Sequence, residues 1–557
     1  MLKNITYPYK LLLLLCGLTT YLTTNGANLA DTSVKKNGTL STRNSYDIGE
    51  NLSAFKDAVA AFKQDSVEKG LHLLVTAFRL AESKNKITRM MDYRELEFYN
   101  IIDEADNGNS SVKEKQFIEA FIKTVIVRKD ESTYKELEAG LKDLPETPFA
   151  LRLKLFFLSF GNNKQVGKQA DRVLKGNPDL LSINTFKAEW PYDNNKYNES
   201  ILFCNKLIAL SPQYAYAYKL RGNNYASLDT PRKAVDDFDK AIKLFPQNIV
   251  LHYDRACALM DLDKYSEAIP DLRKMYANNP GYLWTCYNLA KSYHDLNLPD
   301  SALYFVNLHI TQYPDDGDGY DLKGDVYYGR DDYPEAVELY SQAIKLSPTT
   351  ETFYEDRGNA FFYGGKYPEA LADFQKAVQL DKHRAYANDR LGDCYYQLKE
   401  YQKAITFQQQ AIKIDPDYKY PYVGLSMDQV ELGDYNDAII NCKKAIAIDS
   451  TYDTAIGDLG WDYYCAGDND SCIAYSYKAL KYNEKATYAM FNIALATLRK
   501  GDAEKAKALY RQFIAECKAK GYVIEDGAID DLRNLIKKNI TVDDCKFIIV
   551  QLFEKEI

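Results

Sequence analysis

The sequence predicts an all-α protein, an α-solenoid built from 34-residue helix–turn–helix repeats. Self-similarity at one fixed period is typical of repeat architectures, and DDYPEAVELYSQAIKLSP (331–348) is followed at that spacing by GKYPEALADFQKAVQLDK and KEYQKAITFQQQAIKIDP. Apolar residues within each copy recur at three- and four-residue steps, the period of an amphipathic helix. Alanine and proline keep the same 34-residue interval: Ala234, Ala268, Ala302, Ala336, Ala370, Ala404, Ala438 and Ala506, and Pro178, Pro212, Pro246, Pro280, Pro314 and Pro348.

One copy shows how the unit is expected to fold. Residues 318–329 would form a first helix, DDYP (331–334) a turn, and residues 335–346 a second helix that the following proline ends. Gly324 and Ala336 carry almost no side chain, so the two helices can approach closely. One hairpin cannot bury its apolar face alone, and stacking of the next copy buries it.

The recurring pattern resembles the tetratricopeptide repeat. It consists, in order, of an aromatic or large residue, Leu-Gly, Tyr, Ala, Phe or Tyr, Ala and Pro across 34 residues. Residues 215–520 match as nine copies, and 147–214 match as two degenerate ones. Met275 and His309 depart from the pattern, because alanine is expected at both positions. The resemblance implies a right-handed superhelix of helix pairs in which the first helices line a concave groove.

The N-terminus predicts export. Lys3 and Lys10 precede the apolar run 11–22, and small residues follow, which is the layout of a secretory signal peptide over residues 1–27. The apolar run is too short to span a bilayer. We therefore expect a periplasmic or extracellular protein. The alternative is lipid modification of Cys16, which would anchor the chain to an envelope membrane.

Three further segments complete the predicted organisation. Residues 28–50 are polar and predict a flexible linker. Residues 51–146 have a helical apolar period and form either degenerate repeats or a separate helical cap. Residues 521–557 are expected to form C-terminal capping helices.

Charge and cysteine usage limit the partners. The formal net charge of −9 disfavours nucleic acid and anionic membrane surfaces. Nine cysteines follow Cys16 without a CxxC pair, so free thiols are expected, with a Cys465–Cys472 disulfide as the alternative.

No motif indicates catalysis, a cofactor or a metal. The sequence contains no GxSxG, P-loop or GxGxxG motif, and the five histidines lack metal-ligand spacing. The segment 314–321 is similar to a calcium loop, but Tyr320 stands where a third ligand is needed. We therefore expect neither an enzyme nor a small-molecule substrate.

The first helices carry the candidate site. In one copy Asp318, Asp321, Asp325 and Tyr328 follow at three- and four-residue steps, so they share one helix face, which the resemblance places in the groove. Such acids either form a solvated face or bind a ligand. Aspartate is a poor residue inside helices, and like charges four residues apart repel, which favours a ligand. The predicted groove residues are Trp284, Tyr287, Asp318, Asp321, Asp325, Tyr328, Glu355, Phe362, Tyr386, Asp389, Asp393, Tyr396, Tyr420, Trp461 and Tyr464.

Some members of the family hold a C-terminal carboxylate with Lys and Asn from one repeat and Asn, Lys and Arg from the next two. Lys219 and Asn223 match the first pair, but Asp254 replaces the next Asn and Trp284 replaces Lys. An aspartate there would repel a carboxylate. We therefore expect a basic and partly apolar peptide as the ligand.

Two functions remain open. The first is a non-catalytic scaffold that binds an extended protein segment in an acidic, aromatic groove. The alternative is a structural or assembly component of a cell-envelope complex that acts through self-association or lateral packing. A scaffold should be monomeric and an assembly component should not, and the sequence leaves the oligomeric state open.

Overall fold

The computed structural model describes residues 147–158 and 166–556, with gaps at residue 283 and at 525–526, and a few single positions before residue 147. The predicted signal peptide 1–27 with Cys16, the predicted linker 28–50 and nearly all of the predicted helical region 51–146 lie outside the described residues.

Every regular element of the described residues is a helix, and successive helices pack against each other in pairs. The predicted all-α fold of stacked helix pairs is therefore confirmed. The chain divides into two compact units, one ending at Phe305 and the other beginning at Val306, within one helix, α16 (Pro299–Gln312).

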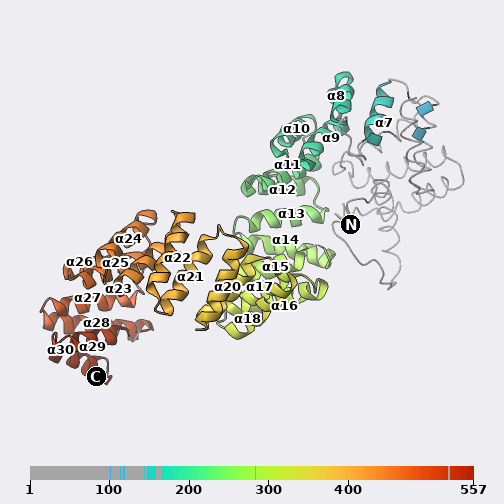
Figure 1. Cartoon of the computed structure of the whole chain (residues 1–557). Coiled ribbons are helices and arrows are strands. Elements are labelled where there is room, and N and C mark those ends of the chain that lie inside the picture. The colour runs from blue at the N-terminus through green and yellow to red at the C-terminus, as the bar shows by residue number, and fades with distance from the viewer. Residues whose placement is uncertain are drawn as a thin grey trace. The chain divides into compact units, whose positions relative to one another are not determined.

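The first unit contains nine complete described helices before α16 (Figure 1). They are α7 (Pro148–Leu158), α8 (Val166–Gly176), α9 (Leu181–Asp193), α10 (Tyr197–Leu210), α11 (Ala215–Ser227), α12 (Pro231–Leu244), α13 (Ile249–Met260), α14 (Tyr265–Asn278) and α15 (Thr285–Asp295).

The second unit continues from α16 to the end of the described chain. Its helices are α17 (Gly317–Tyr328), α18 (Tyr333–Leu346), α19 (Glu351–Tyr363), α20 (Tyr367–Leu380), α21 (Ala385–Gln397), α22 (Tyr401–Ile414), α23 (Tyr420–Leu432), α24 (Tyr435–Ile448), α25 (Asp453–Ala466), α26 (Asn469–Tyr482), α27 (Thr487–Arg499), α28 (Ala503–Lys520), α29 (Gly527–Lys537), α30 (Val542–Phe547) and the π-helix η4 (Ile548–Leu552).

The turn inside each repeat depends on one left-handed residue. Ten residues at consecutive 34-residue intervals have φ between 52° and 92°: Asn195, Asp229, Asp263, Asn297, Asp331, Gly365, Lys399, Gly433, Gly467 and Gly501. Glycine, asparagine and aspartate tolerate this conformation best. The second helix α18 starts at Tyr333, two residues earlier than expected, because Pro334 fits its first turn without needing an N–H donor.

Close approach inside several of the helix pairs depends on glycine. A Cβ atom on Gly324 would lie 2.6 Å from Cε1 of Tyr340, and one on Gly358 would lie 2.9 Å from Cε1 of Phe374. The aromatic side chains of the second helices, both buried, therefore fill the space that the glycines leave in the first helices.

Two residues that depart from the repeat pattern are buried without disturbing it. Met275 and His309 occupy positions where other copies have alanine, and both are buried. Nε2 of His309 lies 2.6 Å from a carboxylate oxygen of Asp316, so the polar ring has a partner.

The C-terminal segment closes the second unit with apolar contacts. Leu532 of α29 and Ile549 of η4 are buried in one cluster with Phe513 of α28 and Phe491 of α27. The last repeat thus has its apolar face covered, as a terminal repeat requires.

Lys399 is the residue least suited to its left-handed position. We expect Lys399→Gly to raise the free energy of unfolding by up to about 1 kcal/mol, because glycine avoids the strain that a side chain meets there. Lys413→Gly, inside α22, should instead lower it by roughly 0.5–1 kcal/mol. Urea denaturation measures both, and equal destabilisation by the two variants would contradict the turn geometry.

Candidate ligand-binding face

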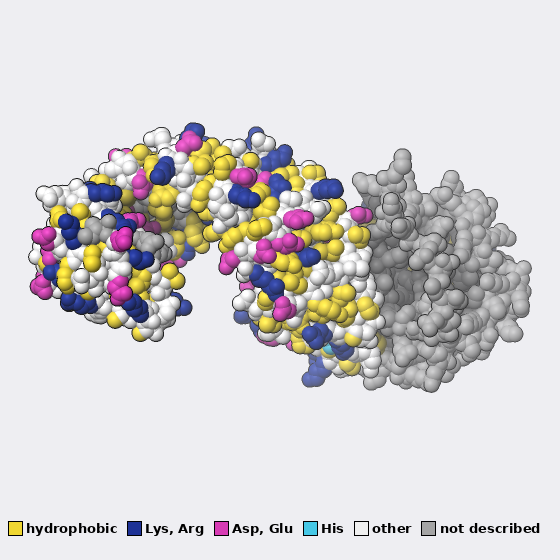
Figure 2. Space-filling model, turned by 90° about the horizontal axis from the view of Figure 1, so that it is seen from below, with side chains coloured by type: hydrophobic (Ala, Val, Ile, Leu, Met, Phe, Trp, Pro, Cys, Tyr) yellow, Lys and Arg dark blue, Asp and Glu magenta, His cyan; other side chains and the backbone are white. Residues whose placement is uncertain are grey.

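The first helices of the second unit form a face rich in carboxyl groups. Successive first helices contact one another at α17–α19, α21–α23, α23–α25 and α25–α27. We give the name acidic row to nine of the carboxyl residues on these first helices: Asp321, Asp325, Glu355, Asp356, Asp389, Asp393, Asp428, Asp458 and Asp462. In the view of Figure 2, acidic and basic side chains are interspersed on the visible surface of the described residues.

Asp321, Asp325 and Asp356 form the first group of the row. Burial, followed by repulsion from Asp325 and Asp356, raises the pKa of Asp321 to about 9. Burial and repulsion from Asp325 and Glu355 raise the pKa of Asp356 to about 8, although Arg384 opposes the shift. Asp325 accepts a hydrogen bond of 2.8 Å from the Tyr340 hydroxyl, whereas Oδ1 of Asp321 has no hydrogen-bond partner. Asp321 and Asp356 therefore retain protons near neutral pH.

Glu355 is paired within the protein. Its side chain is buried, and Nε of Arg384 donates to its Oε1 at 2.9 Å while Nη2 of Arg384 contacts its Oε2. Nη1 of Arg384 also lies 3.8 Å from Oε1 of Glu351. Arg384 therefore neutralises Glu355.

Arg390 occupies a second part of the face. Its Nη1 donates to Oδ2 of Asp393 at 2.8 Å, and its guanidinium lies 5.3 Å from the Tyr386 ring and 6.0 Å from the Phe362 ring. Burial, followed by repulsion from Asp393, raises the pKa of Asp389. Two of the aromatic side chains predicted to contact a ligand therefore already contact a cation of the protein itself.

The row continues through three carboxyls that the sequence did not single out. Asp428 is fully buried and neither of its carboxylate oxygens has a hydrogen-bond partner. Burial, followed by repulsion from Asp393, raises the pKa of Asp428 to about 8. Burial and repulsion from Asp462 raise that of Asp458 to about 7, and burial raises that of Asp462 to about 6, although Ser426 donates to it at 2.7 Å.

A comparison of copies could have revealed these carboxyls. Other copies have Val326, Ala360 and Cys394 where Asp428 and Asp462 stand. A buried carboxyl at a position that is uncharged in the other copies is a departure from the repeat pattern, and it is visible without coordinates.

The predicted aromatic residues differ in exposure. Trp284, in the first unit, is 41% exposed and packs edge-on against Tyr287 at 5.3 Å, and Tyr420, in the second unit, is 47% exposed. Trp461 is half-buried and stacks at 5.2 Å on Tyr464, which is buried.

The remaining predicted residues lie on the first helices of the second unit. Asp318 is exposed, whereas Tyr328 and Tyr396 are half-buried. The Tyr328 ring lies 5.7 Å from that of Tyr333, and the Tyr396 ring lies 5.6 Å from that of Tyr401. Both tyrosines therefore pack against the start of their own second helix.

In the first unit, Asp254 stands where the carboxylate-binding members of the family have asparagine. Nζ of Lys219 lies 3.8 Å from Oδ2 of Asp254, and burial raises the pKa of Asp254 although Lys219 opposes the shift. The lysine that would contact a ligand carboxylate is therefore placed beside an aspartate.

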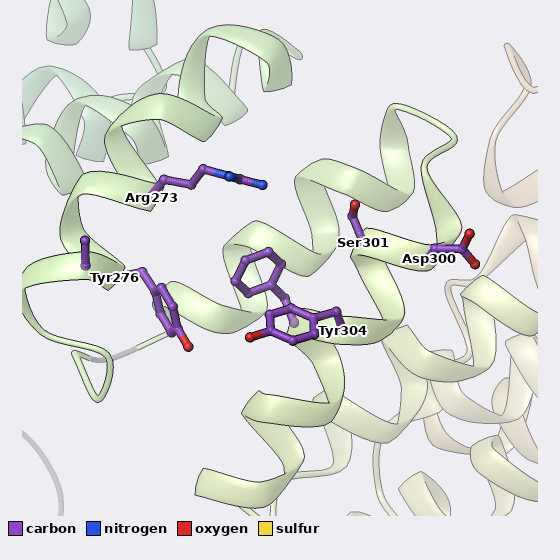
Figure 3. A pocket seen from close by; sticks show the side chains of 7 residues that line it. Arg273, Tyr276, Asp300, Ser301 and Tyr304 are labelled. Carbon is purple, nitrogen blue, oxygen red and sulfur yellow. The ribbon is translucent and has the colours of Figure 1, made fainter.

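The first unit also has a cleft between second helices. It has a volume of about 590 Å³, and Arg273 and Tyr276 of α14 face Asp300, Ser301 and Tyr304 of α16 across it. The hydroxyl groups of Tyr276 and Tyr304 point toward each other (Figure 3). Sequence reasoning concentrated on first helices and did not predict this cleft.

Within the described ranges, no three His, Cys, Asp or Glu side chains are arranged to hold a metal ion. The nine cysteines after Cys16 are free thiols, seven of them buried. None of the described helices has both the length and the apolar character needed to cross a membrane.

Family models match much of the repeat region. Models described as tetratricopeptide repeat match residues 259–326, 355–419 and 488–517, and one described as TPR repeat matches 324–362.

The curated relatives match only in part. Human N-alpha-acetyltransferase 25, the NatB auxiliary subunit, is 26% identical over 136 residues, 24% of this chain and 14% of that protein. The Hsp70-Hsp90 organising protein of Plasmodium falciparum is 24% identical over 161 residues, 23% of this chain and 28% of that protein. The chain therefore spans less than a third of either relative.

Solved structures with a similar arrangement were also found. MamA is 28% identical, with a TM-score of 0.27, over 29% of this chain and 95% of that one. A tetratricopeptide repeat protein from Parabacteroides merdae is 16% identical, with a TM-score of 0.40, over 45% of this chain and 98% of that one. A chain of the APC/C hetero-tetramer Cut9-Hcn1 is 13% identical, with a TM-score of 0.40, over 86% of this chain and 98% of that one.

The raised pKa of Asp428 predicts a pH-dependent stability. An unfolded aspartate has a pKa of about 4, so the native state holds the proton between that value and about 8. The stabilising contribution is complete below the lower value and is lost as the pH rises through the higher one. We expect the calorimetric melting temperature to fall between pH 6 and pH 9, and to fall less in Asp428→Asn.

Asp437→Asn, at an exposed position on α24, is the matched control and should keep the wild-type pH dependence. An identical fall in wild type and Asp428→Asn would show that Asp428 is ionised throughout.

Proposed function

Since the chain is a tetratricopeptide-repeat protein, we propose that it is a non-catalytic scaffold that binds an extended segment of another protein. Tetratricopeptide repeats generally mediate protein–protein interaction. We place the bound segment on the first-helix face of the second unit, and we propose that it is cationic and partly apolar.

The observation that carries this proposal is the acidic row. Asp321, Asp356 and Asp428 are desolvated, and among the described residues none of the three takes part in an ion pair. Holding like charges together out of water costs free energy, and an exposed, solvated face would avoid that cost. A cationic ligand would replace the protons and stabilise the ionised carboxylates.

Ion pairs within the protein reduce the number of acidic residues that can contact the ligand. Arg384 pairs with Glu355 and Arg390 with Asp393, so these acids are less available. The apolar contacts would come from exposed or half-buried rings such as Tyr328, Tyr396 and Tyr420. A lysine or arginine beside such a ring also gains a cation–π contact.

A second candidate is an assembly component of the cell envelope. The cleft between α14 and α16 favours it, because Tyr304 beside the cleft is 58% exposed. A partner that packs on second helices would cover this tyrosine. Sedimentation of the purified chain separates the two candidates, since lateral assembly requires a concentration-dependent oligomer.

The scaffold proposal predicts the effect of removing charge from the row. After the partner has been captured from the native envelope and purified, Asp321→Asn with Asp356→Asn should weaken its binding at least about tenfold, because charge-assisted hydrogen bonds contribute roughly 1.5–3 kcal/mol each. Wild-type binding should weaken with added salt and strengthen from pH 6 to pH 8, since the acids must release protons. Isothermal titration calorimetry measures these affinities.

The matched control is Glu338→Gln with Glu369→Gln, which removes the same charge from exposed positions on the second helices α18 and α20. Asp373 is unsuitable because it is buried and paired with Arg357 at 2.7 Å. Equal loss of affinity in both double variants would make net charge, and not the face, responsible.

We also propose that the protein is exported and works outside the cytoplasm, periplasmic or extracellular. The support is the order of charged, apolar and small residues over 1–27. N-terminal sequencing of the native protein should find a chain that begins near Asn28. A lipid-blocked Cys16 would make the protein membrane-anchored, and a retained Met1 would contradict export.

A further inference from the structure

A small cavity opens on the first-helix face of the second unit. It has a volume of about 60 Å³. Residues of α19, α21, α22 and α23 line it: Phe362, Asp393, Tyr396, Gln397, Gln408, Gly424 and Met427. Three of them, Phe362, Asp393 and Tyr396, are among the predicted groove residues.

Gln408 departs from the repeat pattern. Its side chain is only 1% exposed, yet the same position in other copies holds mostly apolar or aromatic residues. These residues are Phe238, Leu272, Val306, Tyr340, Phe374, Cys442, Ser476 and Tyr510. A buried amide in place of an apolar side chain costs free energy unless a partner satisfies it.

Gly424 makes room for this glutamine. A Cβ atom on Gly424 would lie 2.1 Å from Nε2 of Gln408, so any larger residue would displace the amide. Other copies have Asp356, Arg390 and Asp458 at the position of Gly424. The two departures therefore fit each other, and together they place a buried amide in the wall of this cavity.

The cavity has an unsatisfied hydrogen-bond acceptor. Oε1 of Gln408, which lines the cavity, is buried and has no hydrogen-bond partner. Asp393 has a nearby donor, since Arg390 donates to its Oδ2. What the site lacks is a donor that reaches the amide oxygen of Gln408.

We propose that this cavity binds the ammonium group of a lysine side chain from the protein segment on the first-helix face. This inference rests on the proposed scaffold function. A protonated lysine offers three N–H donors and no acceptor, which matches a site lined by the unpartnered amide oxygen of Gln408 and the carboxyl of Asp393. Its methylene groups would pack on the rings of Phe362 and Tyr396.

The size of the cavity favours lysine over arginine. A water molecule takes about 30 Å³ in the liquid, so the cavity holds about two such volumes, enough for an ammonium group with its last methylene. A guanidinium is larger and binds best to a carboxylate in bidentate fashion. Asp393 is already engaged by Arg390.

Methionine-methyl NMR on the full chain tests the site, because the chain has only seven methionines and Met427 lines the cavity. Met427→Leu assigns the signal. The probes are n-butylammonium, n-butylguanidinium, potassium ion, and the peptide acetyl-Gly-Ser-Lys-Ser-Gly-amide with and without acetylation of its lysine. We expect saturable shifts of the Met427 signal with butylammonium and with the unmodified peptide only.

Gln408→Leu should weaken butylammonium binding roughly 10- to 100-fold, as expected for a hydrogen bond to a charged group. Leu272 shows that the repeat accepts leucine at this position, so the variant should remain folded. Gln409→Leu, at the exposed neighbouring position, is the control and should bind as wild type.

Three results would overturn the inference. The first is a response to potassium alone, and the second is an equal response to butylammonium and butylguanidinium. The third is no response to any probe, which would mean that the cavity holds ordered water. Failure here with a normal effect of Asp321→Asn and Asp356→Asn on partner binding would leave the scaffold function standing. The reverse outcome would retain the amine site and reject the proposed binding face.

Discussion

The strict 34-residue register is the constraint on which the rest of the structure depends. Because no insertion interrupts it, each left-handed turn residue, each small helix-contact residue and each first-helix position recurs in the same place. Side chains at equivalent positions of contacting first helices are therefore brought close together. The same regularity that buries the aromatic rings of Tyr340 and Phe374 under glycines also brings carboxyl groups together on one face.

The protein reduces the resulting repulsion in two ways. Arginines pair with some acids: Arg384, just before α21, pairs with Glu355 of α19, and Arg390 pairs with Asp393 on α21. Other acids, such as Asp321 and Asp428, keep their protons because burial raises their pKa. A protonated carboxyl is a weak partner in the free protein and becomes a strong one when a cation arrives. In our proposal these residues carry the energy of binding.

The period alone was sufficient to predict the helix pairs, because spacing in sequence determines which positions share a helix face. Much of the turn chemistry was equally visible, since Asn, Asp or Gly recurs where the backbone is left-handed. The ion pairs between side chains could not be predicted from the period. Arg384 reaches Glu355 across 29 residues, and this depends on side-chain conformation in adjacent copies. Asp428 and Gln408 were not predicted, because the predicted site comprised one face of the first helices, whereas these two residues are buried at positions where other copies differ.

The central claim is that desolvated carboxyls of the acidic row hold protons at neutral pH in the free protein. Infrared spectroscopy of the chain with carboxyl-labelled aspartate measures this directly, because protonated and ionised carboxyls absorb at different frequencies. We predict a protonated carboxyl band at pH 7 that shrinks when Asp321, Asp356 and Asp428 are replaced by asparagine. A spectrum with only ionised carboxylates at pH 7 would contradict the account.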